Sequence, residues 1–426
     1  MRIRKDTLIK IVATIFVLLY LIAFNNMNTM IFDALITLSL SLFWLIKNKK
    51  NNLMFSMSLF IFYCIYSITV GEYFLKSSLG VPMSEVNTTY IYGLSIRVLM
   101  LFVFIVTLFS DAPNRLSLQM RYKGNDLIYY FLIFVLLLVG LFGVNRNIGL
   151  SYKVNTTPIY EYSTILFLFA YYSTGNNKRK KIVISLILFL FALQDFYLGG
   201  RITALQLMLI FILCMLDDML TSKKIIIGAI FGIVLNSAVA IYRLNYSLNQ
   251  VSIINIAKGL IKNKFVFDTA TYSYYASATH IASIEYANAY FSVRLKSLFE
   301  FVKAIFIGSN NPISNVTQFI SDNYFLNIGG GLFPSHFYFW LGWVGVIFSA
   351  IILVVFLNKL MKSNSDYSLL SLAIIVITSP RWFLYSPLVL FRPQLILGVV
   401  YIMYRTGHNL IMSKYSKDKQ IITSKF

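Results

Sequence analysis

The chain has 426 residues, of which 58% are hydrophobic and only 12% are charged, with a formal net charge of +21. Soluble domains carry about 25% charged residues, so a soluble enzyme is excluded, and the mean hydropathy of +0.72 favours a chain that lies largely in lipid. The positive charges lie in short segments between apolar runs, which is typical of topology signals and not of nucleic-acid binding.

Twelve apolar windows predict an all-α fold, a polytopic bundle of transmembrane helices. In chain order the windows cover residues 7–24, 30–46, 53–71, 90–109, 127–143, 158–174, 182–198, 202–216, 224–241, 335–357, 367–379 and 386–404. Nine spans fill residues 1–241, three fill residues 335–404, and a basic tail occupies residues 405–426.

Basic residues mark one side of the predicted bundle. If the N-terminus is cytoplasmic, the inner segments hold 23 of the 37 Lys and Arg residues but only seven of the 16 acidic residues. The positive-inside rule therefore predicts that both termini lie in the cytoplasm. The first span follows a basic start, but no small-residue cleavage site follows it, so we expect it to remain in the mature protein.

One connector, residues 242–334, is long and is expected on the external side, between the ninth and tenth spans. It carries amphipathic stretches at residues 253–267 and 284–307. Such segments lie along a membrane surface or fold into a small cap over the bundle, and a merely tethered loop is the alternative.

Five arginines fall near the external ends of predicted spans: Arg97, Arg201, Arg243, Arg381 and Arg392. A guanidinium group binds phosphate oxygens through paired hydrogen bonds and keeps its charge at low dielectric, so the set predicts a diphosphate-binding site. The alternative is that each arginine extends to the interface or pairs with an acid such as Asp195 or Glu161.

Two features at helix starts add to this hypothesis. Gly199 and Gly200 precede Arg201, and backbone amides exposed there would contribute to an anion site. His336 opens the tenth span, where the positive end of a helix disfavours imidazolium. We therefore expect His336 to be neutral and to act as a general base, with a polar interface residue as the alternative.

Neither a metal nor a nucleotide cofactor is expected. The sequence has no metal-ligand spacing, no external Asp-x-Asp pair and no Gly-rich phosphate loop on the cytoplasmic side. Cys64 and Cys214 both fall inside predicted spans, where they are most simply small apolar residues.

Three stretches carry a family resemblance: GGRITAL at residues 199–205, SHFYFWLGWVG at 335–345 and PRWFLYSPLVLFRPQ at 380–394. Together with about twelve spans and one large external loop before the tenth, they resemble the bacterial O-antigen polymerases, which are related to the O-antigen ligases. The first half of the chain is similar to this family by hydropathy alone.

The resemblance implies metal-independent glycosyl transfer in lipopolysaccharide biosynthesis, at the periplasmic face of the bacterial inner membrane. The growing glycan on undecaprenyl diphosphate would be the donor, a lipid-linked repeat unit the acceptor, and a chain-length regulator protein a partner. By position, Arg201 matches the arginine of the family's small-Gly-Arg turn, and His336 matches a histidine of the ligases. The ligases commonly place Asn after this histidine, whereas Phe337 follows here.

This chemistry needs a base for the attacking hydroxyl and stabilisation of charge on the departing diphosphate. We expect His336 to supply the first and the arginines, with Arg201 as the catalytic one, to supply the second. Trp340, Trp343 and Trp382 would stack on sugar faces or form an aromatic belt at the interface. A ligase and a lipid-linked oligosaccharide flippase are the alternative functions, although transporters usually show two related halves.

Overall fold

A computed structural model of the chain describes residues 5–24, 29–75, 86, 88–111, 124–144, 157–175, 177–197, 200–216, 220–245, 248–327 and 329–423. Every regular element in these residues is a helix, which confirms the predicted all-α class. The chain forms two compact units. The first unit comprises Met1–Leu118, Leu220–Ser363 and Thr378–Phe391, and the second comprises Gln119–Met219, Asn364–Ile377 and Arg392–Phe426. The predicted divisions after residues 241, 334 and 404 match no boundary of these units.

The first unit holds His336 and most of the predicted external loop. Its elements are α1 (Lys5–Ala23), α2 (Met30–Lys47), α3 (Asn52–Ile68), η1 (Thr69–Phe74), α4 (Thr89–Phe109), α10 (Ser222–Asn245), η5 (Leu248–Gln250), α11 (Ile253–Lys262), α12 (Asp268–Glu285), α13 (Phe291–Phe306), η6 (Pro312–Ser314), α14 (Val316–Asn323), α15 (Phe333–Lys362) and α17 (Ser379–Leu384). Capping residues set several starts. Asn51 Oδ1, for example, accepts the backbone N–H of Met54 at 3.0 Å and so caps α3.

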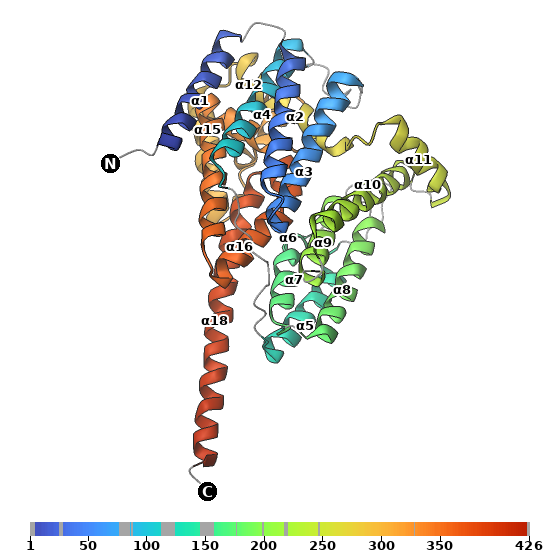
Figure 1. Cartoon of the computed structure of the whole chain (residues 1–426), viewed down its shortest axis with the longest axis vertical. Helices are drawn as coiled ribbons and strands as arrows, with labels where there is room; N and C mark the ends of the chain where they lie inside the picture. The colour runs from blue at the N-terminus through green and yellow to red at the C-terminus, as the bar shows by residue number, and fades with distance from the viewer. Residues whose placement is uncertain are drawn as a thin grey trace. The chain divides into compact units, whose positions relative to one another are not determined.

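The second unit contains α5 (Asp126–Phe142), α6 (Pro158–Glu161), α7 (Ser163–Tyr172), α8 (Lys178–Tyr197), α9 (Ile202–Ile210), η3 (Phe211–Met215), α16 (Asp366–Ile377) and most of α18 (Leu388–Thr423). Helices α5, α7, α8 and α9 pack against one another, as Figure 1 shows. The predicted span at residues 158–174 is divided between α6 and α7. Helix α18 continues to Thr423, so the predicted basic tail is helical for most of its length.

Six helices of the described chain are long and apolar enough to cross a membrane, judged by length and composition: Met30–Lys47, Asn52–Phe74, Thr89–Phe109, Ser222–Tyr242, Phe333–Lys362 and Leu388–Gly407. Four shorter apolar helices lie at Ile9–Leu21, Asp126–Phe142, Ile202–Met215 and Asp366–Ile377. Each predicted span falls on helical residues, so the apolar windows locate the helices. Twelve membrane crossings stay a prediction.

Helix α4 forms the centre of the first unit. It packs against α2, α12 and α15, and α2 and α4 run side by side in Figure 1. Its sequence is apolar on every side, and it is buried along nearly its whole length, as expected for such a helix inside a bundle. The elements around the candidate site are therefore assembled on α4.

Helix α12 lies within the predicted external loop at residues 242–334 and packs into the first unit. Fourteen of its 18 residues are buried, and it packs against α3, α4 and α15. Its small Ala, Ser and Thr side chains allow close approach of the neighbouring helices. Its hydroxyl groups hydrogen-bond within the helix, as Ser277 Oγ does to the carbonyl oxygen of Ser273 at 2.8 Å.

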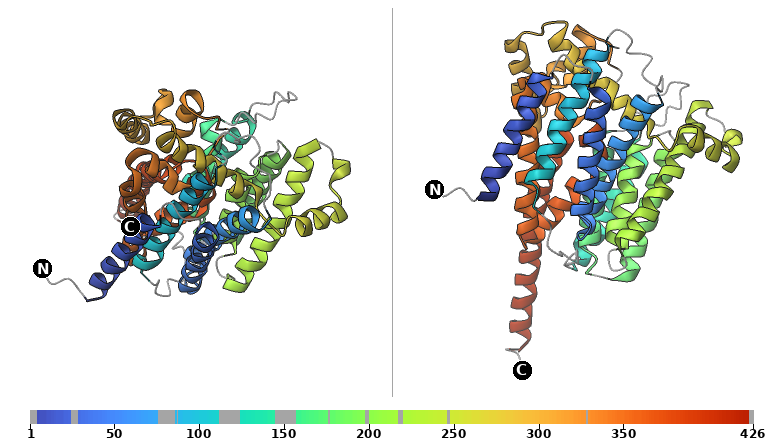
Figure 2. Two further views of the ribbon diagram at one scale, coloured as in Figure 1. Left: turned by 90° about the horizontal axis from the view of Figure 1, so that it is seen from above. Right: turned by 45° about the horizontal axis from the view of Figure 1, so that its top comes forward.

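The two predicted amphipathic stretches do contain helices, α11 and α13. Helix α11 packs beside α10 (Figure 2) and has no buried residue; Ile253, Ile254 and Ile261 are exposed. Helix α13 buries Phe301 and leaves Phe299 and Phe306 exposed. Only part of the predicted loop is thus peripheral to the first unit.

Helix α15 covers the predicted tenth span but is broken within it. Gly342 has φ +61° and ψ −144°, a conformation that is essentially restricted to glycine. The break leaves a short segment, residues 333–341, ahead of residues 343–362. Gly345 is needed just after it, because a Cβ there would lie 2.0 Å from the carbonyl oxygen of Phe337.

Candidate functional site

The structure brings His336 together with a second histidine, His280. His336 lies on the short first segment of α15 and His280 on α12, with ring centroids 4.6 Å apart and planes at 62°. Both residues are buried, with exposed fractions of 2% and 0%. The sequence analysis selected His336 but not His280, because it assigned α12 to the loop.

Hydrogen bonds define which nitrogen of His280 carries the proton. Ser335 Oγ donates its single proton to the carbonyl oxygen of Leu332 at 2.7 Å. It must therefore accept at 3.0 Å from Nδ1–H of His280. Burial, together with the neighbouring His336, holds the pKa of His280 well below its usual value, so the ring is neutral. In a neutral imidazole with Nδ1 protonated, Nε2 is a bare acceptor.

The same reasoning applies to His336. Its ring hydrogen-bonds with the backbone of Gly331 and Tyr385. The N–H groups of these two residues already donate to the carbonyl oxygens of Leu384, at 3.0 Å, and Arg381, at 2.9 Å. His336 therefore donates to carbonyl oxygens. Its Nε2 has no hydrogen-bond partner among the described residues, so Nδ1 is the donor and Nε2 is again a bare acceptor.

Two buried imidazole lone pairs without partners are costly. Nε2 of His280, like that of His336, has no hydrogen-bond partner in the described part of the chain. An unsatisfied buried polar group costs about 1–3 kcal/mol. Such groups call for a ligand, a water or a catalytic role to explain them. Nε2 of either ring can accept a hydrogen bond from a hydroxyl group that reaches it.

A glycine segment closes over the pair. A Cβ on Gly331 would lie 2.4 Å from Cε1 of His280, and a Cβ on Gly330 would lie 2.9 Å from the carbonyl oxygen of Leu384. Only glycine fits at either position, and both have positive φ. The glycine segment therefore lies directly against the ring of His280.

Arg97 is part of a buried ion pair, as the pairing alternative predicted, although with a different acid. Its Nε donates to Oδ2 of Asp33 at 3.0 Å, and both side chains are almost completely buried. Asp33 also accepts from the hydroxyl groups of Tyr20 and Thr29, both at 2.8 Å. A guanidinium engaged inside the bundle joins α2 to α4 and does not face a diphosphate.

Arg201 stands directly before α9, but the anion position at that helix start is filled. Asp195 Oδ2 accepts the backbone N–H of Ala204 at 2.9 Å. A Cβ on Gly200 would lie 2.4 Å from Oδ1 of the same carboxylate, so this position requires glycine. The Ala204 amide is thus occupied by a carboxylate of the chain itself, whereas the contribution of the amides at Gly199 and Gly200 to a diphosphate site stays a prediction. Gly199 lies outside the described residues.

The other three arginines occupy different elements. Arg381 is a half-buried residue of α17 in the first unit. Arg392 lies on α18 in the second unit, where its guanidinium carbon is 5.8 Å from the ring centroid of Tyr162. Arg243 lies on α10, and its side chain is outside the described residues. The first unit thus holds Arg97, Arg243 and Arg381, and the second holds Arg201 and Arg392.

Two of the three predicted sugar-stacking tryptophans belong to the core. Trp340 is buried, and its Nε1 donates to Ser297 Oγ at 3.1 Å. Trp382 is buried against Phe333, with ring centroids 5.3 Å apart. Neither can stack on a sugar or contribute to an interfacial belt. Trp343 alone of the three is partly exposed.

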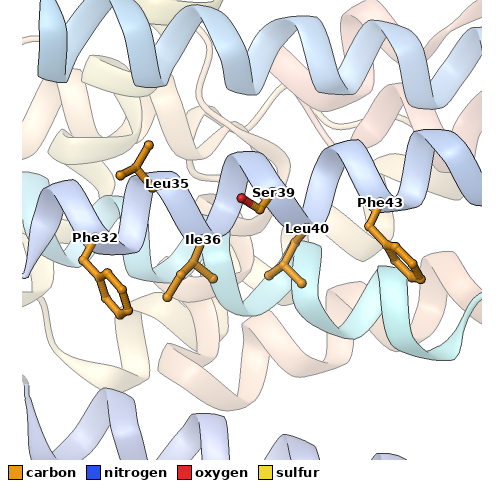
Figure 3. Close-up of a pocket in the computed structure, with 6 residues that line it drawn as sticks. All are labelled: Phe32, Leu35, Ile36, Ser39, Leu40 and Phe43. Carbon is orange, nitrogen blue, oxygen red and sulfur yellow. The ribbon is translucent and has the colours of Figure 1, made fainter.

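Neither the hollow on the first unit nor the acidic, cysteine and histidine side chains of the described residues offer a second site for catalysis. A shallow hollow of about 410 Å³ runs along α2 and is lined by Phe32, Leu35, Ile36, Ser39, Leu40 and Phe43 (Figure 3). All six side chains come from one helix and five are apolar, which suits contact with lipid and not catalysis. The described residues contain no group of three or more His, Cys, Asp or Glu side chains that could hold a metal ion.

Comparison with known proteins does not assign a family. The chain matches no family model, no curated protein and no solved structure.

Proposed function

We propose that the chain is a surface-polysaccharide polymerase of the O-antigen type. It would transfer the growing glycan from undecaprenyl diphosphate onto a lipid-linked repeat unit, at the periplasmic face of the bacterial inner membrane. The proposal includes twelve spans and cytoplasmic termini, because basic residues concentrate in the predicted inner segments. A chain-length regulator is the proposed protein partner.

One observation carries the proposal: two of the three stretches that resemble the O-antigen polymerases lie next to each other at the histidine pair. Residues 335–345 begin just after Phe333, whose ring contacts Trp382 of the stretch at residues 380–394. The glycine segment joins them, since Gly331 N–H donates to the carbonyl oxygen of Leu384 at 3.0 Å. Motif residues distant in sequence thus surround two imidazoles with bare Nε2 atoms.

The proposed reaction needs one proton acceptor and one anion-stabilising group. The acceptor hydroxyl oxygen bonds to the anomeric carbon, the bond from that carbon to the diphosphate oxygen breaks, and undecaprenyl diphosphate leaves with the electron pair. The hydroxyl proton passes to Nε2 of His336. The ring of His280 packs against the ring of His336 and keeps it in position. Arg243 and Arg381 of the first unit remain the proposed diphosphate ligands, whereas the ion pair with Asp33 makes Arg97 a structural residue. Arg201 and Arg392 belong to the second unit.

Deletion of the gene tests this proposal against its alternatives. A polymerase mutant makes lipopolysaccharide capped with a single repeat unit, because ligation continues without polymerisation. A rough core without any repeat unit would instead indicate a ligase, and loss of translocated lipid-linked units would indicate a flippase. Either of these two outcomes would refute the polymerase.

The role of His336 is tested by complementing the deletion with His336→Ala. A general base contributes a factor of about 10² to 10⁴ to the chemical step and little to substrate binding. We expect normal membrane abundance of this variant, retained binding of the lipid-linked glycan, and unpolymerised repeat units. Abundant variant protein that makes full-length polymer would remove His336 from the mechanism.

A further inference from the structure

A polar cluster lies at the end of α12, five residues beyond His280. Glu285 is half-buried, and its Oε1 accepts the hydroxyl of Tyr338 at 3.0 Å. Its Oε2 accepts the hydroxyl of Tyr90 at 3.2 Å. One carboxylate thus joins α12 to α4 and to the short first segment of α15, on which His336 also lies.

Arg294 of α13 supplies the positive charge of this cluster. Its Nη1 donates to the carbonyl oxygen of Phe339 at 3.3 Å, and its guanidinium carbon is 5.3 Å from the ring centroid of Phe291. Its Nε is a buried atom without a hydrogen-bond partner among the described residues. Glu285 and Tyr338 act on Arg294 electrostatically. No ion pair within 4 Å joins Arg294 to Glu285 in the described part of the chain, so the carboxylate is held by two tyrosine hydroxyl groups and the guanidinium by a backbone carbonyl.

Aromatic surface adjoins these charges. Trp343 is partly exposed, and its ring meets that of Tyr338 edge-on, with centroids 5.4 Å apart. Tyr286, the residue after Glu285, is 44% exposed. An exposed aromatic face beside a carboxylate and a guanidinium offers apolar contact for the C–H face of a pyranose and hydrogen-bond partners for its hydroxyl groups.

We propose that Glu285, Arg294, Tyr338 and Trp343 form a saccharide subsite that holds a sugar of the glycan substrate next to the histidine pair. The carboxylate accepts hydrogen bonds from sugar hydroxyl groups, Arg294 donates to sugar oxygens, and Trp343 covers one face of the ring. This inference rests on the proposed function, because it assigns the ligand to the same glycan.

The spacing along the helices places the subsite close to the histidine pair. At 1.5 Å per residue, Glu285 lies about 7.5 Å along the α12 axis from His280, and Tyr338 lies about 3 Å along α15 from His336. Both subsite residues therefore lie within one or two helical turns of a histidine of the pair.

Glu285→Gln and Trp343→Ala test the subsite through substrate binding. Losing a charged hydrogen-bond partner weakens binding by about tenfold. With purified protein in detergent, we expect the dissociation constant for the delipidated repeat-unit oligosaccharide, measured by calorimetry, to rise about tenfold in Glu285→Gln. In the polymerisation assay we expect a similar rise in KM for the lipid-linked repeat unit, with kcat nearly unchanged.

Two controls separate binding from folding. Glu300→Gln removes a carboxylate of α13 that pairs with Lys303 at 3.6 Å, away from the cluster, and should leave both constants unchanged. Trp343→Phe keeps an aromatic face and should restore most of the binding lost in Trp343→Ala. Melting temperatures of all variants are compared with that of the wild type.

The outcomes distinguish this inference from the proposed function. Calorimetric binding that weakens in Glu285→Gln supports the subsite even if no polymer forms, in which case only the polymerase proposal fails. The subsite is overturned if wild-type protein polymerises while folded Glu285→Gln keeps wild-type binding and KM. It is also overturned if folded wild-type protein does not bind the oligosaccharide.

Discussion

At the scale of single residues, the neutral state of His280 has a consequence for stability. Burial lowers the pKa of His280 in the folded protein, whereas the unfolded chain has the ordinary value of about 6.5. Below that pH the His280 ring is protonated in the unfolded state but stays neutral in the folded state. The free energy of unfolding should therefore fall as the pH decreases, by up to about 1.4 kcal/mol per pH unit for this group.

His280→Asn tests this linkage. The Asn amide keeps an N–H donor for Ser335 but does not titrate. The melting temperature of the variant should therefore decrease less than that of the wild type when the pH is lowered from 7.5 to 5.5. Thermal unfolding in detergent at these two pH values measures the difference. An equal decrease in the wild type and the variant would contradict the assignment of a neutral, buried His280.

The proposed diphosphate ligands make a second residue-scale prediction. If a forked guanidinium contact holds the diphosphate, Arg381→Lys should lower polymerisation nearly as much as Arg381→Ala, because the charge survives while the second hydrogen bond does not. Chain-length distribution, measured at equal membrane abundance, gives the result. Full activity of the lysine variant would exclude Arg381 as a bidentate ligand.

At the residue scale, the sequence indicates a candidate only where the residue type alone carries the signal. His336 stands out as a histidine at a helix start, but its neighbour His280 is 56 positions away in sequence. The acid that pairs with Arg97 is Asp33, 64 positions away in sequence, and not Glu161 or Asp195, the two acids considered from the sequence. Such partners are chosen by helix packing, which composition and periodicity do not reveal.

At the scale of elements, Gly342 determines how the short segment with His336 and Tyr338 is oriented. A Cβ at Gly342 would meet no atom within 4 Å, so the cost of Gly342→Ala comes from its backbone conformation alone. That cost is about 1–3 kcal/mol. We expect a lower melting temperature and reduced polymerisation for this variant.

The matched control for Gly342 is Gly232, which lies inside α10 and also has no atom within 4 Å of an added Cβ. Because alanine is favoured over glycine in a regular helix by about 1 kcal/mol, Gly232→Ala should be neutral or stabilising. Melting curves of both variants decide the point. A Gly342→Ala protein as stable and active as Gly232→Ala would show that the break in α15 is dispensable.

Element-scale prediction failed at α12 for a physical reason. Hydropathy finds helices that are buried because they are apolar, and it located every apolar helix in the described residues. Helix α12 is buried because many of its side chains are small and because its Ser and Thr hydroxyl groups bond within the helix. Its run of Ala, Ser and Thr over 18 residues was the available signal, since small residues at three- and four-residue spacing favour close helix contact.

At the scale of the whole molecule, the proposed orientation in the membrane rests on the distribution of basic residues. A phosphatase reporter, which is active only outside the cytoplasm, should be active when fused after Asn315 and inactive when fused after Lys180. Enzyme activity of the two fusions, normalised to their abundance, gives the result. The reverse pattern would overturn both the topology and the periplasmic assignment of the histidine pair.

The central claim is that the chain by itself lengthens a lipid-linked glycan. Lipid-linked repeat units isolated from the deletion strain are incubated with the purified protein in liposomes, with a chelator and without nucleotide sugars, and the products are separated by size. We expect a ladder whose steps equal one repeat unit, with one undecaprenyl diphosphate released for each bond formed. Repeat units that remain single in the presence of folded protein would contradict the claim.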